Sequence, residues 1–330
     1  MKKIINKPGT EVDDELNGLS LLSGSKIHRI ENTKIILRNN APVKKVNIIS
    51  GGGSGHEPLH SGYVGRGMLD AAVSGEIFTS PTIDDIMEAS KKVYGGTGLL
   101  YIIKNYTGDV LNFTICEENL KSEGYNVDHV IVNDDVALND MENRRGVAGT
   151  MFVEKIAGAA SELNYNLSDV KRVASKTIES TRSMGIAIKP GIIPLNGKPN
   201  FTLKEDEMEI GIGIHGEPGI KRDKIRTADK IAGLLFDNIN KDLKLGENDE
   251  VSVLVNGMGA TPLMELFILY RKIYEILKNR NIKIFRSFVG NYVTSLEMAG
   301  ASLTLMRMDD ELKKLLVEPE ETLYFPKTIW

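Results

Sequence analysis

Short apolar runs rich in β-branched residues alternate along the chain with longer segments in which apolar residues recur every three or four positions. Runs of the first kind predict strands at residues 45–49, 98–103 and 127–132, and segments of the second kind predict helices at 110–121 and 149–163. The run at residues 98–103 is continuously apolar, as expected where a parallel strand is buried on both faces. This alternation predicts an α/β fold with a mostly parallel sheet and helices on both sides of it.

The pattern changes between residues 185 and 200, where glycines and prolines interrupt it repeatedly. Such punctuation is typical of a linker or a run of turns. We therefore predict an N-terminal domain of residues 1–185 and a C-terminal domain of residues 186–330. In the second domain, residues 228–243 predict an amphipathic helix and residues 251–255 predict a strand.

Residues 51–58, Gly-Gly-Gly-Ser-Gly-His-Glu-Pro, directly follow the first of these strands. Consecutive glycines permit positive φ, and a turn built from them lets backbone N–H groups converge on a small polar or anionic ligand. The carboxyl end of a strand in an open α/β sheet is also where ligands usually bind. The segment therefore predicts a small-molecule site with His56 at its rim. The alternative is a tight turn with a surface histidine.

This glycine segment does not match a nucleotide-binding motif. No lysine follows its last glycine, as a P-loop requires, and the glycines lack the Gly-x-Gly-x-x-Gly spacing of dinucleotide-binding folds. The five histidines also lack a zinc-like spacing, and Pro58 disfavours the continuous helix that would bring His56 and His60 onto one face. We therefore expect no metal site and no nucleotide cofactor in this chain.

Two more candidate residues follow the strand at 98–103, whose carboxyl end should lie on the same edge of the sheet as the glycine segment. Asp109 could accept a proton from a hydroxyl group, or it could simply be the N-cap of the following helix. Lys104 could contact a ligand, or it could be an ordinary exposed lysine.

Residues 207–215 alternate strictly, which predicts a strand with two different faces. One face would carry methionine and isoleucine toward a core, and the other would carry Glu209, Gly211, Gly213 and His215. Because the two glycines clear that face, we expect a pocket beside His215. An imidazole there could act as a base or add to a carbonyl carbon, whereas the alternative is a strand-end histidine facing water.

Composition restricts the partners of the chain. Its 330 residues have a net charge of −4, which disfavours a nucleic acid or a membrane surface as the main partner. Its single cysteine, Cys116, cannot form an internal disulfide and is compatible with the cytoplasm. No signal peptide is apparent at the start of the sequence, and no apolar run approaches the ~20 residues that span a membrane.

Five segments together resemble the substrate-binding K subunit of the dihydroxyacetone kinases in their order and spacing: Gly51–Pro58, Gly75–Pro81, Ile103–Asp109, Arg144–Ala148 and Gly213–Gly219. The resemblance extends over essentially the whole chain. It implies two α/β domains, the C-terminal one smaller and built on a mixed sheet, and a homodimer.

The resemblance also implies roles for individual residues. His215 would hold dihydroxyacetone covalently as a hemiaminal on its carbonyl carbon. His56 and Asp109 would contact the substrate hydroxyls and carry out acid–base chemistry. Gly53, Ser54, Gly55 and Lys104 would complete the substrate-binding site. The nucleotide and its Mg²⁺ would be bound by a separate L subunit, which receives its phosphoryl group from the phosphoenolpyruvate phosphotransferase system through a multiphosphoryl protein.

Two other functions stay open at the level of the sequence. Paralogues of this subunit act as ligand-sensing co-activators that bind a transcription regulator, and because they keep the histidine, His215 does not distinguish them from kinases. The complete loop at residues 105–109 favours the kinase. The third possibility is a degenerate sugar-binding scaffold.

Overall fold

The computed structural model describes residues 2–325 and divides the chain into two compact units whose segments interleave. The N-terminal unit contains residues 2–132, 150–177 and 314–325, and the C-terminal unit contains residues 133–149 and 178–313. The sequence pattern instead places a single boundary between residues 185 and 186. The difference arises because two helices and the end of the chain belong to the first unit although they follow a segment of the second.

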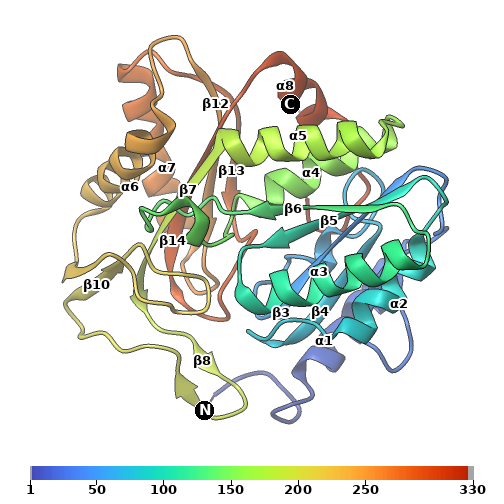
Figure 1. The fold of residues 1–330 in the computed structure, drawn as a ribbon. Coiled ribbons are helices and arrows are strands. Elements are labelled where there is room, and N and C mark those ends of the chain that lie inside the picture. Colours follow the sequence, from blue (N-terminus) through green and yellow to red (C-terminus); the bar gives the residue numbers. More distant parts are fainter. Residues whose placement is uncertain (1, 326–330) are drawn as a thin grey trace. The chain divides into compact units, whose positions relative to one another are not determined.

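The N-terminal unit is built on a six-stranded sheet with the strand order β1-β2-β4-β3-β5-β6. Strands β3 to β6 are labelled in Figure 1. The four strands from β4 to β6 in this order are mutually parallel, and β1 and β2 pair antiparallel at one edge. The expectation of a mostly parallel sheet is therefore confirmed. The strand bounds are β1 Ile27–Arg29, β2 Ile35–Arg38, β3 Val46–Ser54, β4 Ala71–Ile77, β5 Gly98–Lys104 and β6 Val127–Val132.

Side chains of a strand alternate between the two faces of the sheet, so apolar side chains project from both faces and helices cover them. Ile49 of β3 and Tyr101 of β5 pack with α2 and α3 in one apolar cluster, whereas Ser50 of β3 lies in the layer that contains α4. The helices of this unit are α1 Glu11–Ser23, α2 Ile83–Val93, α3 Thr107–Ser122, α4 Thr150–Glu162 and α5 Leu167–Ser180, with a short 3₁₀ turn η1 at Ser61–Tyr63.

The C-terminal unit contains a second six-stranded sheet, in the order β11-β10-β7-β14-β12-β13. Only β12 and β13 pair in parallel, so the sheet is mixed, as expected. The strand bounds are β7 Thr181–Lys189, β10 Glu207–Ile210, β11 Lys221–Lys224, β12 Glu250–Gly257, β13 Lys283–Gly290 and β14 Ala299–Arg307, and β8 Ile192–Ile193 pairs with β9 Lys198–Pro199 in a separate hairpin.

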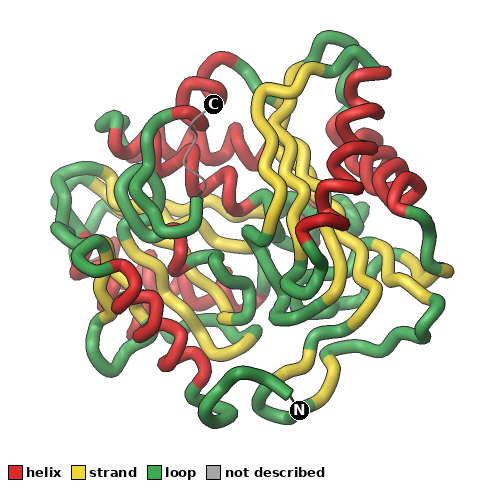
Figure 2. The backbone as a smooth tube through the Cα atoms, turned by 180° about the vertical axis from the view of Figure 1, so that it is seen from behind, coloured by secondary structure: helices red, strands yellow, loops and turns green. Residues whose placement is uncertain are grey.

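Two long helices, α6 Ala228–Leu243 and α7 Leu263–Asn279, pack against one face of this sheet; they are the red helices beside the yellow strands at the upper right of Figure 2. The apolar positions predicted for α6 are Ile231, Leu235 and Ile239, and all three are buried in the core of the unit. A short helix, α8 Asp310–Val317, follows β14, and a 3₁₀ turn η2 lies at Met141–Asn143.

The prediction of a linker between residues 185 and 200 is wrong for residues 185–189. Those residues include the end of β7, a nine-residue strand that lies between β10 and β14. The strand escapes prediction because it begins with polar residues and contains Gly185. Its polar groups are satisfied inside the sheet: the hydroxyl of Ser183 lies 2.6 Å from that of Thr304 on β14.

Across residues 2–325, no helix has both the length and the apolar character needed to cross a membrane.

Candidate active site

The glycine segment is the end of a strand and not a turn. β3 continues through Gly51, Gly52 and Gly53 to Ser54, and of the glycines in this segment only Gly55 has a positive φ, at 102°. The expected glycine turn at residues 51–53 is therefore wrong. Glycine is required there for a different physical reason, which is the close approach of neighbouring groups.

At Gly51, Gly52 and Gly53, a neighbouring atom occupies the space that a Cβ would need. A Cβ on Gly51 would lie 2.3 Å from the carbonyl oxygen of Val73 in β4, and one on Gly52 would lie 2.0 Å from Nζ of Lys104. A Cβ on Gly53 would lie 2.7 Å from the backbone of Phe78. The segment thus brings the chain's backbone close to Lys104 and to the loop that contains Phe78.

Lys104 ends β5 and is fully buried, so the alternative of an exposed lysine is wrong. Its Nζ lies 3.3 Å from the carbonyl oxygen of Gly51, 2.9 Å from Nε2 of His60 and 3.4 Å from Oδ2 of Asp109. An ammonium group has three N–H donors and no acceptor, so these three groups satisfy it. The buried charge is paired with a carboxylate, which is the usual condition for burying a lysine.

Asp109 is the third residue of α3, and Tyr106 occupies the N-cap position. The N-cap alternative for Asp109 is therefore wrong. The carboxylate is buried in the first turn of the helix, beside the partial positive charge of the helix N-terminus. An ionised aspartate at this place is able to accept a proton from a hydroxyl group.

His56 is fully buried, and its ring stacks on Phe78 with 5.1 Å between the centroids. Phe78 has a φ of 56°, an unusual conformation for a bulky residue and one that often marks a functional site. Its backbone N–H donates to the carbonyl oxygen of Ser54 at 3.0 Å. The hydroxyl of Ser54 donates to the carbonyl oxygen of Gly75, and the N–H of Gly55 donates to Glu57. Ser54 and Gly55 thereby hold the loop on which His56 lies.

Two residues of this cluster, His60 and Glu154, were not among the predicted site residues. The His60 Nδ1 lies 2.5 Å from Oε1 of Glu154 and 3.0 Å from the hydroxyl of Ser50. Glu154 comes from α4, which is buried along almost its whole length. A signal was present in the sequence, because a glutamate inside the otherwise apolar start of that helix is unusual.

Burial controls the protonation of both residues. Burial raises the pKa of Glu154 to about 8, and the neighbouring hydroxyl of Ser50 and the charge of Lys104 only partly oppose it. Burial also holds the pKa of His60 well below its usual value of 6.5, and the nearby charges of Lys104 and His56 add to that effect. His60 is therefore neutral near pH 7.

His215 lies in the C-terminal unit, beyond the end of β10. The strand stops at Ile210 because Gly211 has a φ of 77°, so the predicted strand through His215 is wrong. The glycines do not leave an open face either. A Cβ on Gly213 would lie 2.0 Å from Oε2 of Glu217 and 2.7 Å from Nη1 of Arg145, which shows that these two side chains occupy that space.

Glu217 holds His215 through two contacts. Its Oε1 lies 2.8 Å from Nδ1 of the imidazole, and its Oε2 accepts the backbone N–H of His215 at 2.9 Å. Burial by itself would raise the pKa of Glu217, but the hydrogen bond and charge of His215, with a contribution from Arg145, outweigh burial and lower it. An ionised Glu217 accepts the proton on Nδ1, so the lone pair of the neutral ring lies on Nε2.

Arg145 holds the loop of His215 through contacts with Asp135 and Gly211. Its guanidinium contacts the carboxylate of Asp135 at 2.7 Å and donates to the carbonyl oxygen of Gly211 at 2.8 Å. Burial raises the pKa of Asp135 to about 6, although the charge of Arg145 opposes this. Arg145 belongs to one of the segments that carry the family resemblance, and its position explains why an arginine there helps to shape the loop of His215.

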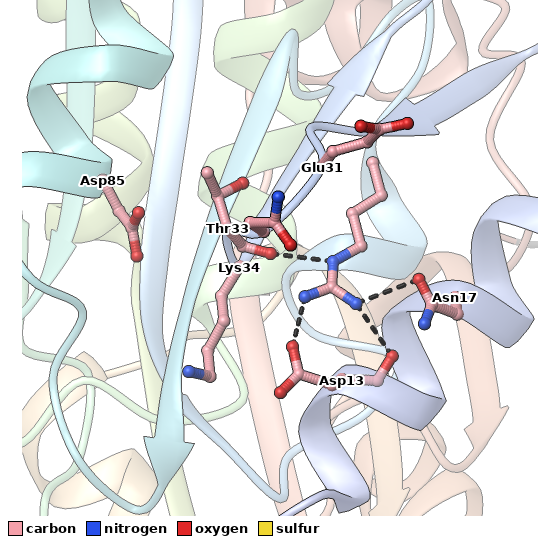
Figure 3. Close-up of a pocket in the computed structure, with 8 residues that line it drawn as sticks. Asp13, Asn17, Glu31, Thr33, Lys34 and Asp85 are labelled. Carbon is pink, nitrogen blue, oxygen red and sulfur yellow. Dashed lines mark hydrogen bonds and ion pairs between the residues drawn. The ribbon is translucent and has the colours of Figure 1, made fainter.

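Neither the metal-like cluster nor the polar pocket of the N-terminal unit contains a predicted site residue. Glu117, Asp128 and His129 have ligand atoms within 4.8 Å of one another, but Lys121 and Lys171 already pair with the two carboxylates. The polar pocket lies beside α1, where Asp13 and Asn17 point toward the guanidinium of Arg29 and bind it (Figure 3). Arg29 also donates a hydrogen bond from Nε to the carbonyl oxygen of Thr33 at 2.7 Å. We interpret both features as structural.

The two α/β units, one with a buried lysine–aspartate pair and the other with a histidine oriented by a glutamate, define the structural class of the protein. The match to known proteins makes this specific: the Dak1 domain model covers residues 17–324, and the chain belongs to that family. The resemblance to the dihydroxyacetone kinases is thereby confirmed.

Individual relatives agree with this assignment. A protein of Listeria innocua called the dihydroxyacetone-binding subunit DhaK of a PTS-dependent dihydroxyacetone kinase is 47% identical over 314 residues, which are 94% of this chain and 95% of that protein. The dihydroxyacetone kinase of C. freundii is 35% identical with a TM-score of 0.90 over 98% of this chain and 60% of that one. The structure of the dihydroxyacetone kinase operon co-activator DhaQ is 34% identical with a TM-score of 0.90, over 96% of this chain and 98% of that one.

Proposed function

We propose that this chain is the dihydroxyacetone-binding subunit of a dihydroxyacetone kinase and that it holds its substrate as a hemiaminal on His215. The observation that carries the proposal is the contact between Glu217 and Nδ1 of His215. It leaves the Nε2 lone pair to attack the carbonyl carbon of dihydroxyacetone. The carbonyl oxygen takes up one proton and becomes a hydroxyl, and the ring gives up its Nδ1 proton to Glu217, so the hemiaminal is neutral. Covalent capture orients a small triose that offers little surface for binding, and it selects against glycerol, which has no carbonyl.

The residues around the glycine segment have the chemistry needed to bind the hydroxyl groups of the substrate. Asp109 accepts the proton of the hydroxyl that attacks the phosphoryl group, and His56 assists as the second acid–base group. Lys104 belongs to the same proposed site, where its ammonium group pairs with the carboxylate of Asp109. Gly53, Ser54 and Gly55 complete the proposed substrate-binding site. Phosphoryl transfer depends mainly on positioning and charge, which this cluster of buried polar groups can supply.

The nucleotide and its Mg²⁺ belong, in this proposal, to a separate L subunit. The multiphosphoryl protein of the phosphotransferase system supplies the phosphoryl group to that subunit. The proposal is supported by the name of the Listeria innocua relative, a dihydroxyacetone-binding subunit that matches over almost its whole length. A cytoplasmic location agrees with the single, buried cysteine Cys116.

We further propose that the chain forms a homodimer through the C-terminal unit. Helix α7 exposes an apolar strip of Leu263, Met264, Phe267 and Ile268 to solvent, each more than 40% exposed. Contiguous apolar surface of this kind is typical of protein interfaces. Sedimentation of the purified chain measures its mass in solution. A monomer at micromolar concentration would contradict this part of the proposal.

Reconstitution tests the central proposal. The purified chain is mixed with an L subunit, the multiphosphoryl protein and a phosphoenolpyruvate-driven phosphoryl supply, and dihydroxyacetone phosphate is measured. We expect formation of product that requires this chain, with glycerol giving none. An intact, substrate-binding chain that forms no product with any cognate partner set would contradict a kinase function.

The second candidate is a dihydroxyacetone-sensing co-activator that binds a transcription regulator and catalyses nothing. It is favoured by the close structural match to the co-activator DhaQ. The same reconstitution separates the two candidates, because a co-activator would bind dihydroxyacetone and yield no phosphate ester. Pull-down of a transcription regulator in a dihydroxyacetone-dependent manner would then support the co-activator directly.

A further inference from the structure

The buried carboxyl group of Glu154 has no role in the chemistry proposed above. It is fully buried on α4, and its Oε2 has no hydrogen-bond partner within residues 2–325. Its other oxygen, Oε1, is 2.5 Å from Nδ1 of His60. A carboxyl group is costly to bury, so a buried one that contacts a histidine beside a candidate active site calls for a functional explanation.

His60 lies between Glu154 and Lys104, with one ring nitrogen facing each. Its Nε2 is 2.9 Å from Nζ of Lys104. An ammonium group can only donate hydrogen bonds, so Nε2 must accept, and the single proton of the neutral ring must then lie on Nδ1. Oε1 of Glu154 accepts that proton. The hydroxyl of Ser50, which donates to the carbonyl oxygen of Ile102, can also accept from Nδ1 at 3.0 Å.

We infer that Glu154 and His60 are positioning residues for the phosphoryl-acceptor site: Glu154 at Nδ1 and Lys104 at Nε2 together fix the Nδ1–H tautomer of His60, and Nε2 of His60 holds the ammonium group of Lys104 beside Asp109. The cluster connects four parts of the chain: Glu154 is on α4, Lys104 ends β5, Asp109 lies in the first turn of α3 and His60 precedes η1. The catalytic consequence rests on the proposed function, whereas the tautomer of His60 does not.

The protonation of the cluster agrees with this inference. The charged and titratable groups that face His60 are Glu154, Lys104 and His56, and those that face Glu154 are His60 and Lys104. Because the pKa of Glu154 is raised to about 8, much of it carries a proton near neutral pH. That proton can reside on Oε2, so Oε1 still accepts from His60 in either protonation state.

Three variants test the inference. Glu154→Gln keeps an acceptor oxygen for Nδ1–H, and Glu154→Leu has nearly the same size without any acceptor. Glu162→Gln is the matched control. It removes a carboxylate from the last residue of the same helix, where Glu162 pairs with Arg38 and Lys45.

The first readout is the ¹⁵N spectrum of the His60 ring in the isolated chain, assigned with His60→Gln. We expect the Nδ1–H tautomer in the wild type, in Glu154→Gln and in Glu162→Gln, and a mixture or the Nε2–H tautomer in Glu154→Leu. A wild-type His60 in the Nε2–H form would overturn the inference, and this measurement is informative even if Glu154→Leu does not fold.

The second readout is kcat/KM for dihydroxyacetone in the reconstituted system. We expect Glu154→Leu to lose about tenfold or more, as for a hydrogen bond to a charged group, with Glu154→Gln within about threefold of wild type. A folded Glu154→Leu with wild-type kinetics would overturn the positioning role. If the wild type itself forms no product, the proposed function fails, and the ring spectrum still decides the tautomer.

Discussion

Glu217 is the residue that gives His215 a defined tautomer, in the way that a carboxylate orients the histidine of a catalytic triad. The comparison extends to its charge, because a carboxylate on Nδ1 increases the nucleophilicity of Nε2. The roles of His215 and His56 then differ clearly. His215 has a carboxylate partner on the ring, whereas His56 is stacked on Phe78.

This difference predicts which histidine carries the substrate. After incubation with dihydroxyacetone under gentle conditions without borohydride, intact-mass spectrometry should show a gain of one dihydroxyacetone in the wild type and in His56→Ala. His215→Ala should show none, because it lacks the nucleophile. An adduct that persists in His215→Ala would mean that the nucleophile is a different residue.

The pKa of Glu217 predicts a pH dependence of stability. Its folded pKa lies below the ordinary value of 4.5, because the contacts with His215 outweigh burial. Ionisation of Glu217 therefore favours the folded state above pH 4.5, and this contribution is lost as the pH falls through the lower, folded pKa.

Urea unfolding of the wild type and of Glu217→Gln, from about pH 3 to about pH 6, measures this effect. We expect the wild type to be the more stable at the upper end, and the difference between the two to shrink toward the lower end. A difference that grows as the pH falls would show that the sign is wrong.

Asp109 is a buried carboxylate paired with Lys104, which suits it to act as the general base. Asp109→Asn keeps the shape of the side chain but cannot take up the hydroxyl proton. We expect the variant to bind dihydroxyacetone and to transfer phosphate about 10²–10⁴-fold more slowly.

The matched control is Asp169→Asn, since Asp169 is also the third residue of its helix, α5, and its side chain is partly exposed. It removes the same interaction with a helix N-terminus without touching the site. Turnover of Asp109→Asn within a few-fold of that control would mean that Asp109 serves only to stabilise the start of α3.

At the scale of elements, the end of β3 positions the groups around Lys104. The strand carries glycine at three successive positions because the neighbouring strand β4, Lys104 and the loop at Phe78 all approach its backbone. This close packing makes the strand intolerant of even a methyl group. The same elements bring Glu154 and His60 together across 94 positions of sequence.

Substitution of Gly51 tests how closely β3 and β4 approach. Gly51→Ala places a Cβ 2.3 Å from the carbonyl oxygen of Val73, and we expect a loss of about 1–3 kcal/mol in the free energy of unfolding. Gly18→Ala is the control: it lies in α1 with nothing within 4 Å of the new Cβ, and should gain about 0.5–1 kcal/mol. Thermal unfolding of both variants measures the contrast, and a neutral Gly51→Ala would contradict the proposed crowding.

At the scale of the whole molecule, the proposed division of labour assigns substrate to this chain and nucleotide to another. We expect the isolated chain to show no ATP binding by calorimetry in the micromolar range and no ATP hydrolysis. The reason is that the glycine segment is the end of a strand whose backbone is crowded by Lys104 and Phe78, and it offers no phosphate-binding loop. Micromolar ATP binding by the isolated chain would contradict this assignment.

The order of elements and the candidate residues were accessible from the sequence alone. Apolar runs and helical periodicity depend on local spacing, so β5, β6, α4 and α6 could be predicted within a few residues. The motifs around His56, Lys104, Asp109 and His215 were sufficient to indicate the dihydroxyacetone kinase family.

The tertiary structure decided what surrounds those residues. The burial of Lys104, the contact between Glu217 and His215 and the pairing of His60 with Glu154 depend on side-chain packing, and only the second joins near neighbours in the sequence. Strand β7 was missed for the same reason: its pattern along the chain resembles a linker, and only pairing with the neighbouring strand satisfies its polar groups. The interleaving of the two units likewise depends on contacts between segments that are distant in the sequence. Local periodicity reports which face of an element is apolar, whereas only the folded chain determines which polar groups meet inside it.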